Sequence, residues 1–240
     1  MNHKLGKKPV RHDHRTLKLR AYLPSLPPLP GAIDWSLKVP LWNMDLNDQL
    51  GCCVIAAASH MDMLWTANAG NEVIPADSDV LAAYEAVGGY NPSDPSTDQG
   101  CVMLDALNYW RNTGMFGGKI NSYVSLDITS VEELQAAVAL FGAAYIGVNL
   151  TQADMDNSGL WDNAFDPNAV IGGHAIPLVA YGSNQFICVT WGAVKTLTAE
   201  WLKPRIEEAY CVLSPAWIAA NGSAPSGFNA AQLQQDLAAL

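Results

Sequence analysis

The sequence has 240 residues, half of them hydrophobic, and a formal net charge of −10 at pH 7. A chain of this length can bury a sizeable core in one domain or in two closely packed lobes. No uninterrupted apolar run is long enough to span a bilayer as a helix, so we expect no membrane partner. Five cysteines, two of them adjacent, do not form the pattern of a disulfide-rich secreted domain.

The charge is unevenly distributed along the chain. Residues 1–20 contain seven Lys and Arg residues against one acid, Asp13, so this segment carries +6 and the remainder −16. A basic arm on an acidic body could bind nucleic acid, dock on its own body or on a neighbouring acidic copy, or stay a solvated tail. Because so polar a segment is rarely ordered alone, we expect it to pack against protein rather than nucleic acid.

The first half of the chain predicts helices. Proline-rich residues 22–31 should be extended, because proline fixes φ and restricts the residue before it, and they join the arm to the body. Helices are then expected at 53–69, 79–87 and 101–113, separated by loops rich in turn-forming residues. The first of these is apolar nearly all round, which indicates burial.

A second composition begins near Ile120. A capping box at Ser130 predicts a helix to about Phe141, and Thr198 caps a shorter helix. The polar loop 151–170, with Trp161 and Phe165, is interpreted as a cleft wall. Strands are expected at 143–150, 174–181, 185–190 and 209–213, and an amphipathic helix at 230–240. Helices followed by strands are typical of an α+β fold with two lobes and a cleft between them.

The chain is organised around residues 47–58, a polar loop that leads through Leu50 and Gly51 into two cysteines and an apolar helix. Cys53 lies at the start of that helix, where backbone N–H groups and the macrodipole favour a thiolate. Because the thiolate is the nucleophilic form of cysteine, this position suits a nucleophile. The competing interpretation is that Cys53 is a small buried hydrophobe.

A nucleophile needs a base, and His174 is the only histidine in the last three quarters of the chain. It follows Gly172 and Gly173 and opens an apolar, strand-like run. A cysteine early and a histidine more than a hundred residues later are typical of a cysteine hydrolase whose partners meet in the fold. The competing interpretation is a hydrogen-bonded core histidine.

These motifs resemble the papain family of cysteine peptidases, in its shorter bacterial and phage-borne form. The resemblance covers about residues 32–214 and implies an N-terminal helical lobe, a C-terminal antiparallel β-sheet or barrel lobe, and an active-site cleft between them. The matching segments are Asp34-Trp35 (the mature start), Leu50-Gly51-Cys52-Cys53 (the family's Leu-Gly-Ser-Cys), Gly173-His174-Ala175 with Tyr181-Gly182, and Thr190-Trp191-Gly192 (its Ser-Trp-Gly).

The resemblance implies roles for individual residues. Cys53 is the nucleophile and His174 the general base, the two forming a thiolate–imidazolium pair. Asn47 is at the position of the oxyanion-hole glutamine, with Gln49 as a rival. Cys52 is interpreted as structural or, less directly, as a redox partner.

Other positions concern the substrate and the environment. Gln99 and Gly100 are the candidates for binding substrate backbone, and Trp191 would floor the leaving-group side or belong to the core. Relatives from secreted settings bridge a cysteine three positions before the nucleophile; here that position is Leu50, so a reducing compartment is expected.

Two features depart from the family pattern. The asparagine that orients the catalytic imidazole corresponds here to Val189, which cannot accept a hydrogen bond, so another residue or a backbone carbonyl would have to substitute. Only about thirty residues precede Asp34, too few for the family's inhibitory pro-segment, so we expect no conventional pro-domain.

We therefore divide the chain into an arm (1–31), a papain-like domain (helical lobe 32–118, β lobe 119–214) and an extension (215–240). The first hypothesis is a cysteine peptidase acting on a peptide or protein substrate through an acyl-thioester. The second is a weak or inactive papain-fold structural protein, such as a virion or assembly component, that binds partners through arm and tail. No cofactor is expected, and the aspartates lack a metal-ligand spacing. Without a secretory signal at the N-terminus, a cytoplasmic or virion-associated location is expected.

Overall fold

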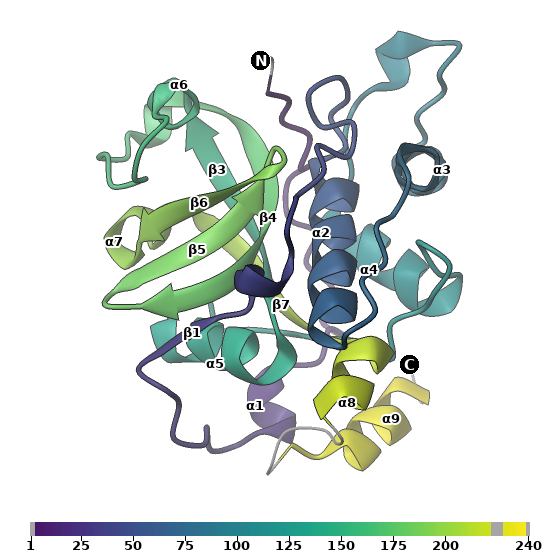
Figure 1. The fold of residues 1–240 in the computed structure, drawn as a ribbon. Coiled ribbons are helices and arrows are strands. Elements are labelled where there is room, and N and C mark those ends of the chain that lie inside the picture. Colours follow the sequence, from purple (N-terminus) through teal and green to yellow (C-terminus); the bar gives the residue numbers. More distant parts are fainter. Residues whose placement is uncertain (1–2, 222–227, 239–240) are drawn as a thin grey trace.

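The computed structural model describes residues 3–221 and 228–238. Helices α3 (Asp77–Gly88) and α4 (Met103–Asn112) lie on one side of the long helix α2 (Cys53–Asn68) (Figure 1). A twisted antiparallel sheet lies on the other side, together with α5 (Val131–Phe141), α6 (Gln152–Asp156) and α7 (Ala199–Leu202). The expected α+β architecture with two lobes is confirmed. Within the described residues, no helix is long and apolar enough to cross a bilayer.

The helical side is built around α2, whose residues are buried on nearly every face through Trp65. Helices α3 (Asp77–Gly88) and α4 (Met103–Asn112) pack beside it, and the rings of Trp65 and Trp110 lie 5.7 Å apart. The ends of α2 and α4 lie within two residues of the ends expected from sequence, and α3 begins two residues earlier. Buried aromatic and aliphatic side chains therefore fix α2 in place, which matters because its first residue is Cys53.

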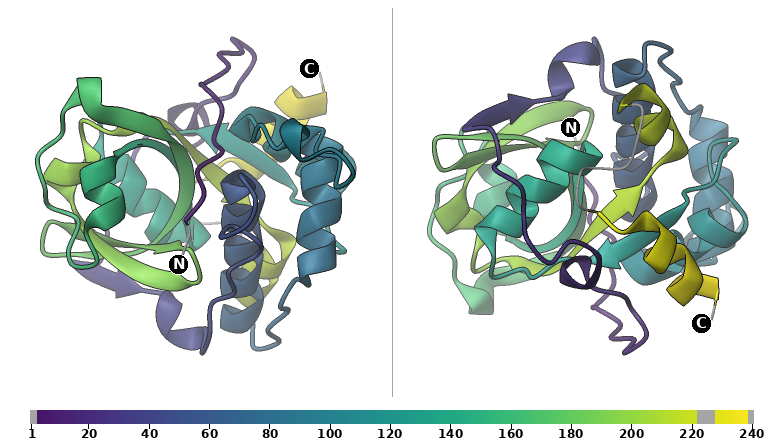
Figure 2. Two further views of the ribbon diagram at one scale, coloured as in Figure 1. Left: turned by 90° about the horizontal axis from the view of Figure 1, so that it is seen from above. Right: turned by 90° about the horizontal axis from the view of Figure 1, so that it is seen from below.

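The sheet runs in the order β2-β7-β3-β4-β5-β6, and every neighbouring pair in it is antiparallel. Its strands are β2 (Ser122–Ser125), β3 (Ala144–Thr151), β4 (Val170–Gly182), β5 (Gln185–Thr190), β6 (Ala193–Thr198) and β7 (Ile206–Leu213), with β1 (Ala32–Asp34) paired to β4. The sheet curls strongly (Figure 2) but does not close into a barrel among the described residues.

Short helices cover the rest of the sheet. Ser130 caps α5 (Val131–Phe141) by accepting a hydrogen bond from the Glu133 N–H, and Thr198 caps α7 (Ala199–Leu202) in the same way. The loop expected at 151–170 contains α6 (Gln152–Asp156). Strands β2 and β6 were not expected, and β4 begins four residues earlier than predicted.

The two sides meet where β4 crosses α2. The hydroxyl of Tyr145 on β3 donates a 2.6 Å hydrogen bond to the carbonyl of Val54 on α2. His174 lies on β4, in register with Val148 of β3. This crossing places the two sequence-predicted catalytic residues on facing elements.

Both ends of the chain pack against the body. The N-terminal residues run between the sheet and α2 (Figures 1 and 2), and α1 (Leu19–Tyr22) follows them. Helix α8 (Pro215–Asn221) packs on α2, where Trp217 meets Trp35 edge-on with ring centroids 5.0 Å apart. Helix α9 (Ala230–Ala238) is tied to α1 by the Tyr22 hydroxyl on Asp236; the end of the helix predicted at 230–240 lies outside the described residues.

Candidate active site

Cys53 is the first residue of α2 and is 1% exposed. Its position leaves its backbone N–H at the open N-terminal end of the helix, where such groups have no intrahelical partner. The neighbouring Cys52 thiol points away and donates to the Asp45 carbonyl at 3.3 Å. Cys52 therefore anchors the preceding loop, whereas the Cys53 thiol meets the Ala175 backbone of β4.

His174 is hydrogen-bonded to Thr190, a residue to which the family resemblance assigned no role. Its Nε2 shares a 2.7 Å hydrogen bond with the Thr190 hydroxyl, and its ring stacks on Trp191 with centroids 4.4 Å apart. The other ring nitrogen, Nδ1, is buried and has no hydrogen-bond partner among the described residues. Nδ1 is therefore the nitrogen of His174 that is not already engaged, and the backbone of Ala175, the next residue, bonds the Cys53 thiol.

Thr190 takes the place of the missing asparagine. Val189 is buried in the core, and alternation along β5 turns the next side chain, Thr190, to the other face, toward the imidazole. A hydroxyl can both donate and accept a hydrogen bond, which valine cannot do. The sequence could have indicated this role, because Thr190 is the hydroxyl residue that directly follows Val189 and precedes Trp191.

Trp191 forms the floor beside His174 and adopts a positive φ of 47°. Its ring also stacks on His3, with centroids 4.3 Å apart and planes within 5°, and its Nε1 donates to the Lys4 carbonyl at 3.3 Å. Trp161 meets it edge-on at 6.3 Å. Trp191 therefore links the imidazole to the N-terminal chain and to the loop behind it.

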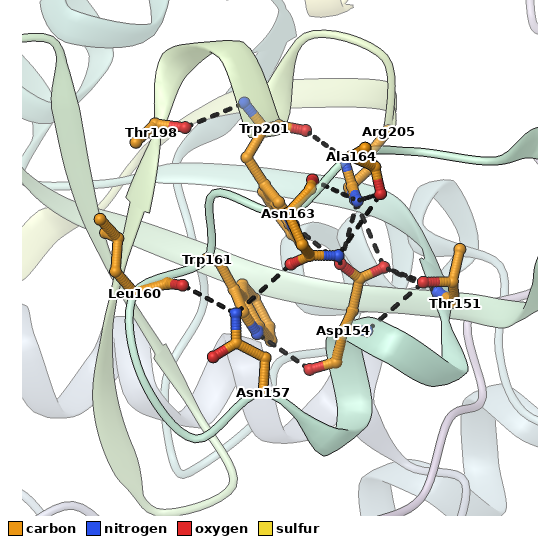
Figure 3. Close-up of polar contacts among 10 residues, drawn as sticks. All are labelled: Thr151, Asp154, Asn157, Leu160, Trp161, Asn163, Ala164, Thr198, Trp201 and Arg205. Atoms are coloured by element: carbon orange, nitrogen blue, oxygen red, sulfur yellow. Dashed lines mark hydrogen bonds and ion pairs between the residues drawn. The ribbon is translucent and has the colours of Figure 1, made fainter.

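That loop is held by a buried polar cluster around Asp154 (Figure 3). The Asp154 carboxylate accepts hydrogen bonds from Arg205, Asn163 and the Trp201 indole N–H. Burial alone would raise the Asp154 pKa, but its hydrogen bonds hold it below the usual range. Trp161 stacks on Trp201 at 4.5 Å, so this cluster supports the wall behind Trp191.

Of the two residues considered as oxyanion donors, Asn47 is the one that contacts the N-terminal chain. It is buried, and its Nδ2 donates to the carbonyls of Lys4 at 3.2 Å and of Leu50 at 3.1 Å. Gln49 is exposed. The amide that faces the N-terminal chain therefore comes from Asn47.

The other wall of the cleft is the turn at Gly100. Gly100 has φ +76°, and a Cβ there would lie 1.9 Å from the Gly6 carbonyl oxygen. The next residue, Cys101, donates its N–H to that same carbonyl and accepts from the Lys8 N–H, each at 2.8 Å. Gln99 does not join them, because its exposed side chain donates to the Ser96 carbonyl. Sequence reasoning missed the backbone of Cys101.

Two polar side chains hold this turn against α2. The Tyr84 hydroxyl donates to Asp98 at 2.5 Å and accepts from the Gly100 N–H at 2.9 Å. Asp98 also accepts from the Gly51 N–H, one residue before the cysteine pair. The glycine wall and the start of α2 are therefore one hydrogen-bonded unit.

Residues 3–8 of the chain itself, called the strap below, fill the space between α2 and β4 (Figure 2), and the cleft is this filled space. The backbone N–H groups of Gly6 and Lys7 donate to the Gly173 carbonyl, and the Lys4 N–H donates to the Asn47 carbonyl. A Cβ on Gly6 would lie 1.8 Å from the Gly51 carbonyl oxygen, so only glycine fits as the strap passes the thiol. The arm thus packs on its own body, and this role was not foreseen from the sequence.

The strap also sets the electrostatics of the pair. Burial raises the pKa of the Cys53 thiol to about 11, against backbone hydrogen bonds from Ala175 and Gly6. Burial, with repulsion from His3 and His60, lowers the pKa of His174 to about 3. Both shifts favour the neutral forms of the two groups while the strap is in place, because burial disfavours a charged thiolate and a charged imidazolium.

The described residues contain no group of three or more His, Cys, Asp or Glu side chains that could hold a metal ion. Asp45 lies 3.3 Å from His60 Nε2, and Asp98 is engaged by the Gly100 turn. The chemistry that this arrangement can support is thiol–imidazole chemistry on a bound extended backbone.

Comparison with known proteins finds similarity in structure only. No family model and no curated protein matches the chain. The structure of xylellain, a cysteine protease from Xylella fastidiosa, matches with a TM-score of 0.69 and 16% identity over 88% of this chain and 96% of that one. Procathepsin B S9 from Trypanosoma congolense gives 0.62 and 11% identity, over 88% of this chain and 86% of that one.

A third similar structure is the Carica candamarcensis cysteine protease CMS1MS2 in complex with E-64. Its TM-score is 0.59 at 14% identity, and the match covers 78% of this chain and 99% of that one. At such identities the similarity establishes the fold. The chain has the fold of papain-like cysteine proteases.

Proposed function

We propose that this protein of papain-like fold is a cysteine peptidase or amide hydrolase, with Cys53 as nucleophile and His174 as general base. The observation that carries the proposal is the strap itself. An extended peptide backbone lies beside the Cys53 thiol, hydrogen-bonded to Gly173 on one side and Cys101 on the other. These bonds are made by main-chain groups, which a substrate backbone also offers, although the strap itself passes Gly51 only because residue 6 is glycine.

The reaction would proceed through an acyl-thioester. His174 Nδ1 takes the Cys53 proton, the thiolate attacks the scissile carbonyl, and the imidazolium returns the proton to the leaving amine. Water then hydrolyses the thioester with His174 acting as base again. The Thr190 hydroxyl engages Nε2, which leaves Nδ1 as the ring nitrogen for this role.

The tetrahedral oxyanion would be stabilised by the Asn47 side-chain amide and the Cys53 backbone N–H at the start of α2. Removal of one such donor raises a barrier by about 3 kcal/mol in comparable sites. In this structure the Asn47 amide donates to the Lys4 carbonyl, so the strap holds a carbonyl oxygen against one of these donors.

On this proposal the structure is a latent state. The strap fills the cleft, buries the thiol and keeps both members of the pair neutral, so it has to leave before substrate binds. A separate inhibitory domain is not required, because six residues are enough to cover the site.

A second candidate function is a papain-fold structural protein without activity, such as a component of a virion or another assembly. The full burial of Cys53 and the replacement of the orienting asparagine favour it. It predicts that Cys53 stays inert even when the strap is displaced.

Covalent labelling separates the two. The full-length Gly6→Ala protein, in which the new Cβ clashes with Gly51, is treated with iodoacetamide and an epoxysuccinyl probe between pH 5 and 9, with Cys53→Ser and Gly6→Ala/His174→Ala beside it. A peptidase labels selectively at Cys53 below the ordinary thiol pKa and loses this when His174 is removed. Labelling no faster than that of free cysteine, unaffected by His174, would refute the peptidase proposal.

A further inference from the structure

A second feature of the cleft is the pocket that receives the side chain of Lys7. The Lys7 ammonium is fully buried, 2.8 Å from a Glu207 oxygen and 3.2 Å from a Glu208 oxygen. It also donates to the Lys8 carbonyl at 3.3 Å. One buried cation therefore faces two carboxylates.

Both carboxylates reach the same pocket because β7 contains a bulge there. Gly147 of β3 pairs with Glu208, and the next residue, Val148, pairs with Ile206, so Glu207 is the extra residue. In a regular strand neighbouring side chains point to opposite faces. The bulge re-aims one of them, and two adjacent acids converge on one cation.

The pocket is shaped for a long side chain. A Cβ on Gly147 would lie 2.2 Å from Lys7 Cε and 2.7 Å from Cδ, so the missing side chain of Gly147 is the space through which the Lys7 stem passes. The Tyr210 hydroxyl donates to the other Glu208 oxygen at 2.8 Å. Polar partners thus fix Glu208 before any occupant arrives.

The lysine does not use the full capacity of the pocket. The Glu208 oxygen nearest Lys7 is buried and makes an ion pair but no hydrogen bond among the described residues. An ammonium offers three donors and a guanidinium five. When the strap leaves, both carboxylates lose their cation. The Glu208 side chain is 4% exposed, whereas that of Glu207 is 35% exposed. An unpaired buried charge such as Glu208 is costly, so a basic side chain is the occupant that would restore the pair.

We propose that the pocket formed by Gly147, Glu207, Glu208 and Tyr210 is a specificity subsite that selects peptides with a lysine or arginine side chain, and that Lys7 is its intramolecular occupant. This inference rests on the proposed peptidase function. The main-chain bonds on either side of Lys7 have no preference for charge, whereas this pocket discriminates by charge and length. The substrate class is therefore basic peptides or basic segments of proteins.

Binding to the pocket can be measured without catalysis. Full-length Lys7→Ala empties the pocket, and n-butylammonium, which reproduces the missing stem and charge, is titrated while the melting temperature is followed. We expect n-butylammonium to raise the melting temperature and n-butanol not to, because binding to the native state stabilises it. Glu208→Gln in the same background should weaken the apparent affinity at least tenfold, and the more exposed Glu207→Gln should weaken it less.

Equal stabilisation by n-butylammonium and n-butanol, or an effect unchanged by both glutamine substitutions, would overturn the subsite. Wild-type protein, with Lys7 in the pocket, is the control and should not respond. If Glu208→Gln fails to fold, the affinity of Glu207→Gln for n-butylammonium is compared with that of Lys7→Ala alone. An unchanged affinity would then overturn the subsite.

Matched fluorogenic peptides then connect the pocket to the reaction. Peptides that differ only in lysine, arginine, norleucine or glutamate at one position are offered, at each position in turn, to Gly6→Ala/Lys7→Ala protein, in which the strap is displaced and the pocket is empty. We expect at least a tenfold preference for lysine and arginine over norleucine at one position, reduced by Glu208→Gln.

The two failures are distinguishable. Hydrolysis without any basic preference contradicts the subsite and leaves the peptidase proposal standing. Selective n-butylammonium binding with no hydrolysis of any peptide contradicts the peptidase proposal and leaves a basic-peptide-binding pocket.

Discussion

Gly6 passes the carbonyl of Gly51 so closely that a Cβ at position 6 would lie 1.8 Å from that oxygen. Gly51 is two residues before Cys53, so the strap is thinnest where it crosses the nucleophile. A contact of this kind involves two backbones, and neither can yield without moving its segment. The closed state of the cleft therefore depends on the absence of one methyl group.

The first prediction is that Gly6→Ala opens the cleft. The clash displaces the strap, and iodoacetamide should label Cys53 at least ten times faster than in wild type at pH 7. Gly31→Ala is the matched control. A Cβ on Gly31 would have no heavy atom within 4 Å, and the φ of Gly31 is not positive. This variant should therefore leave the labelling rate unchanged. Equal labelling rates in the two variants would show that the strap does not gate the thiol.

The sequence predicted much of this architecture because its signals are local. The apolar run after Cys53, the Ser130 capping box and the order Cys53, His174, Trp191 each specify an element or a position without reference to the rest of the chain. These features carried the two-lobe fold and the central helix.

What the sequence did not predict depends on contacts between distant segments. The sequence predicts that the basic arm packs against protein, but only the contacts of the strap with Gly173 and Cys101 place it beside Cys53. The β7 bulge that joins Glu207 to Glu208 has no local signature. Strand β6 is a polar edge strand whose sequence lacks the alternation of hydrophobic and polar residues. The sequence pattern therefore did not predict that it pairs with β5.

The second prediction concerns Thr190, which holds His174 at Nε2. In the Gly6→Ala background, Thr190→Val keeps the shape and removes the hydrogen bond, a loss of about 1–3 kcal/mol. We expect labelling of Cys53, and any peptide hydrolysis, to fall about 10- to 100-fold.

The control is Thr190→Ser, which retains the hydroxyl and should recover most of the rate. The pH profile of labelling is measured for all three proteins, because a misoriented imidazole changes its midpoint and a loss of folding does not. A Thr190→Val rate equal to that of Thr190→Ser would remove Thr190 from the site.

The third prediction uses the ion pair behind the cleft wall. Arg205 and Asp154 are both almost fully buried, so Arg205→Met leaves an unpaired carboxylate and should lower the free energy of unfolding by about 3–5 kcal/mol. Arg11, half exposed in its pair with Asp105, is the matched control, and Arg11→Met should cost about 0–1 kcal/mol. Urea unfolding measures both, and similar losses would mean that the buried pair is not the support described above.

The last prediction is that acid loosens the strap. The His174 pKa is held at about 3 by burial and the repulsion of His3 and His60, whereas an imidazole in water titrates near 6.5. Above pH 6.5 His174 is neutral in both the closed and the open state, so the closed state then carries no penalty for burying the imidazole. That penalty appears and grows as the pH falls from 6.5 toward 3, because the open state binds a proton that the closed state does not.

Hydrogen exchange of the Gly6, Lys7 and Lys8 amides, corrected for the intrinsic pH dependence of exchange, reports strap opening directly. Their protection should fall between pH 7 and pH 4 in the wild-type protein. His174→Gln removes the titrating group at this position and should flatten that dependence, while His60, which is also buried with a lowered pKa, stays unchanged as an internal control. Protection that is the same at both pH values in the wild-type protein, or an equal fall in His174→Gln, would show that His174 does not couple proton binding to the strap.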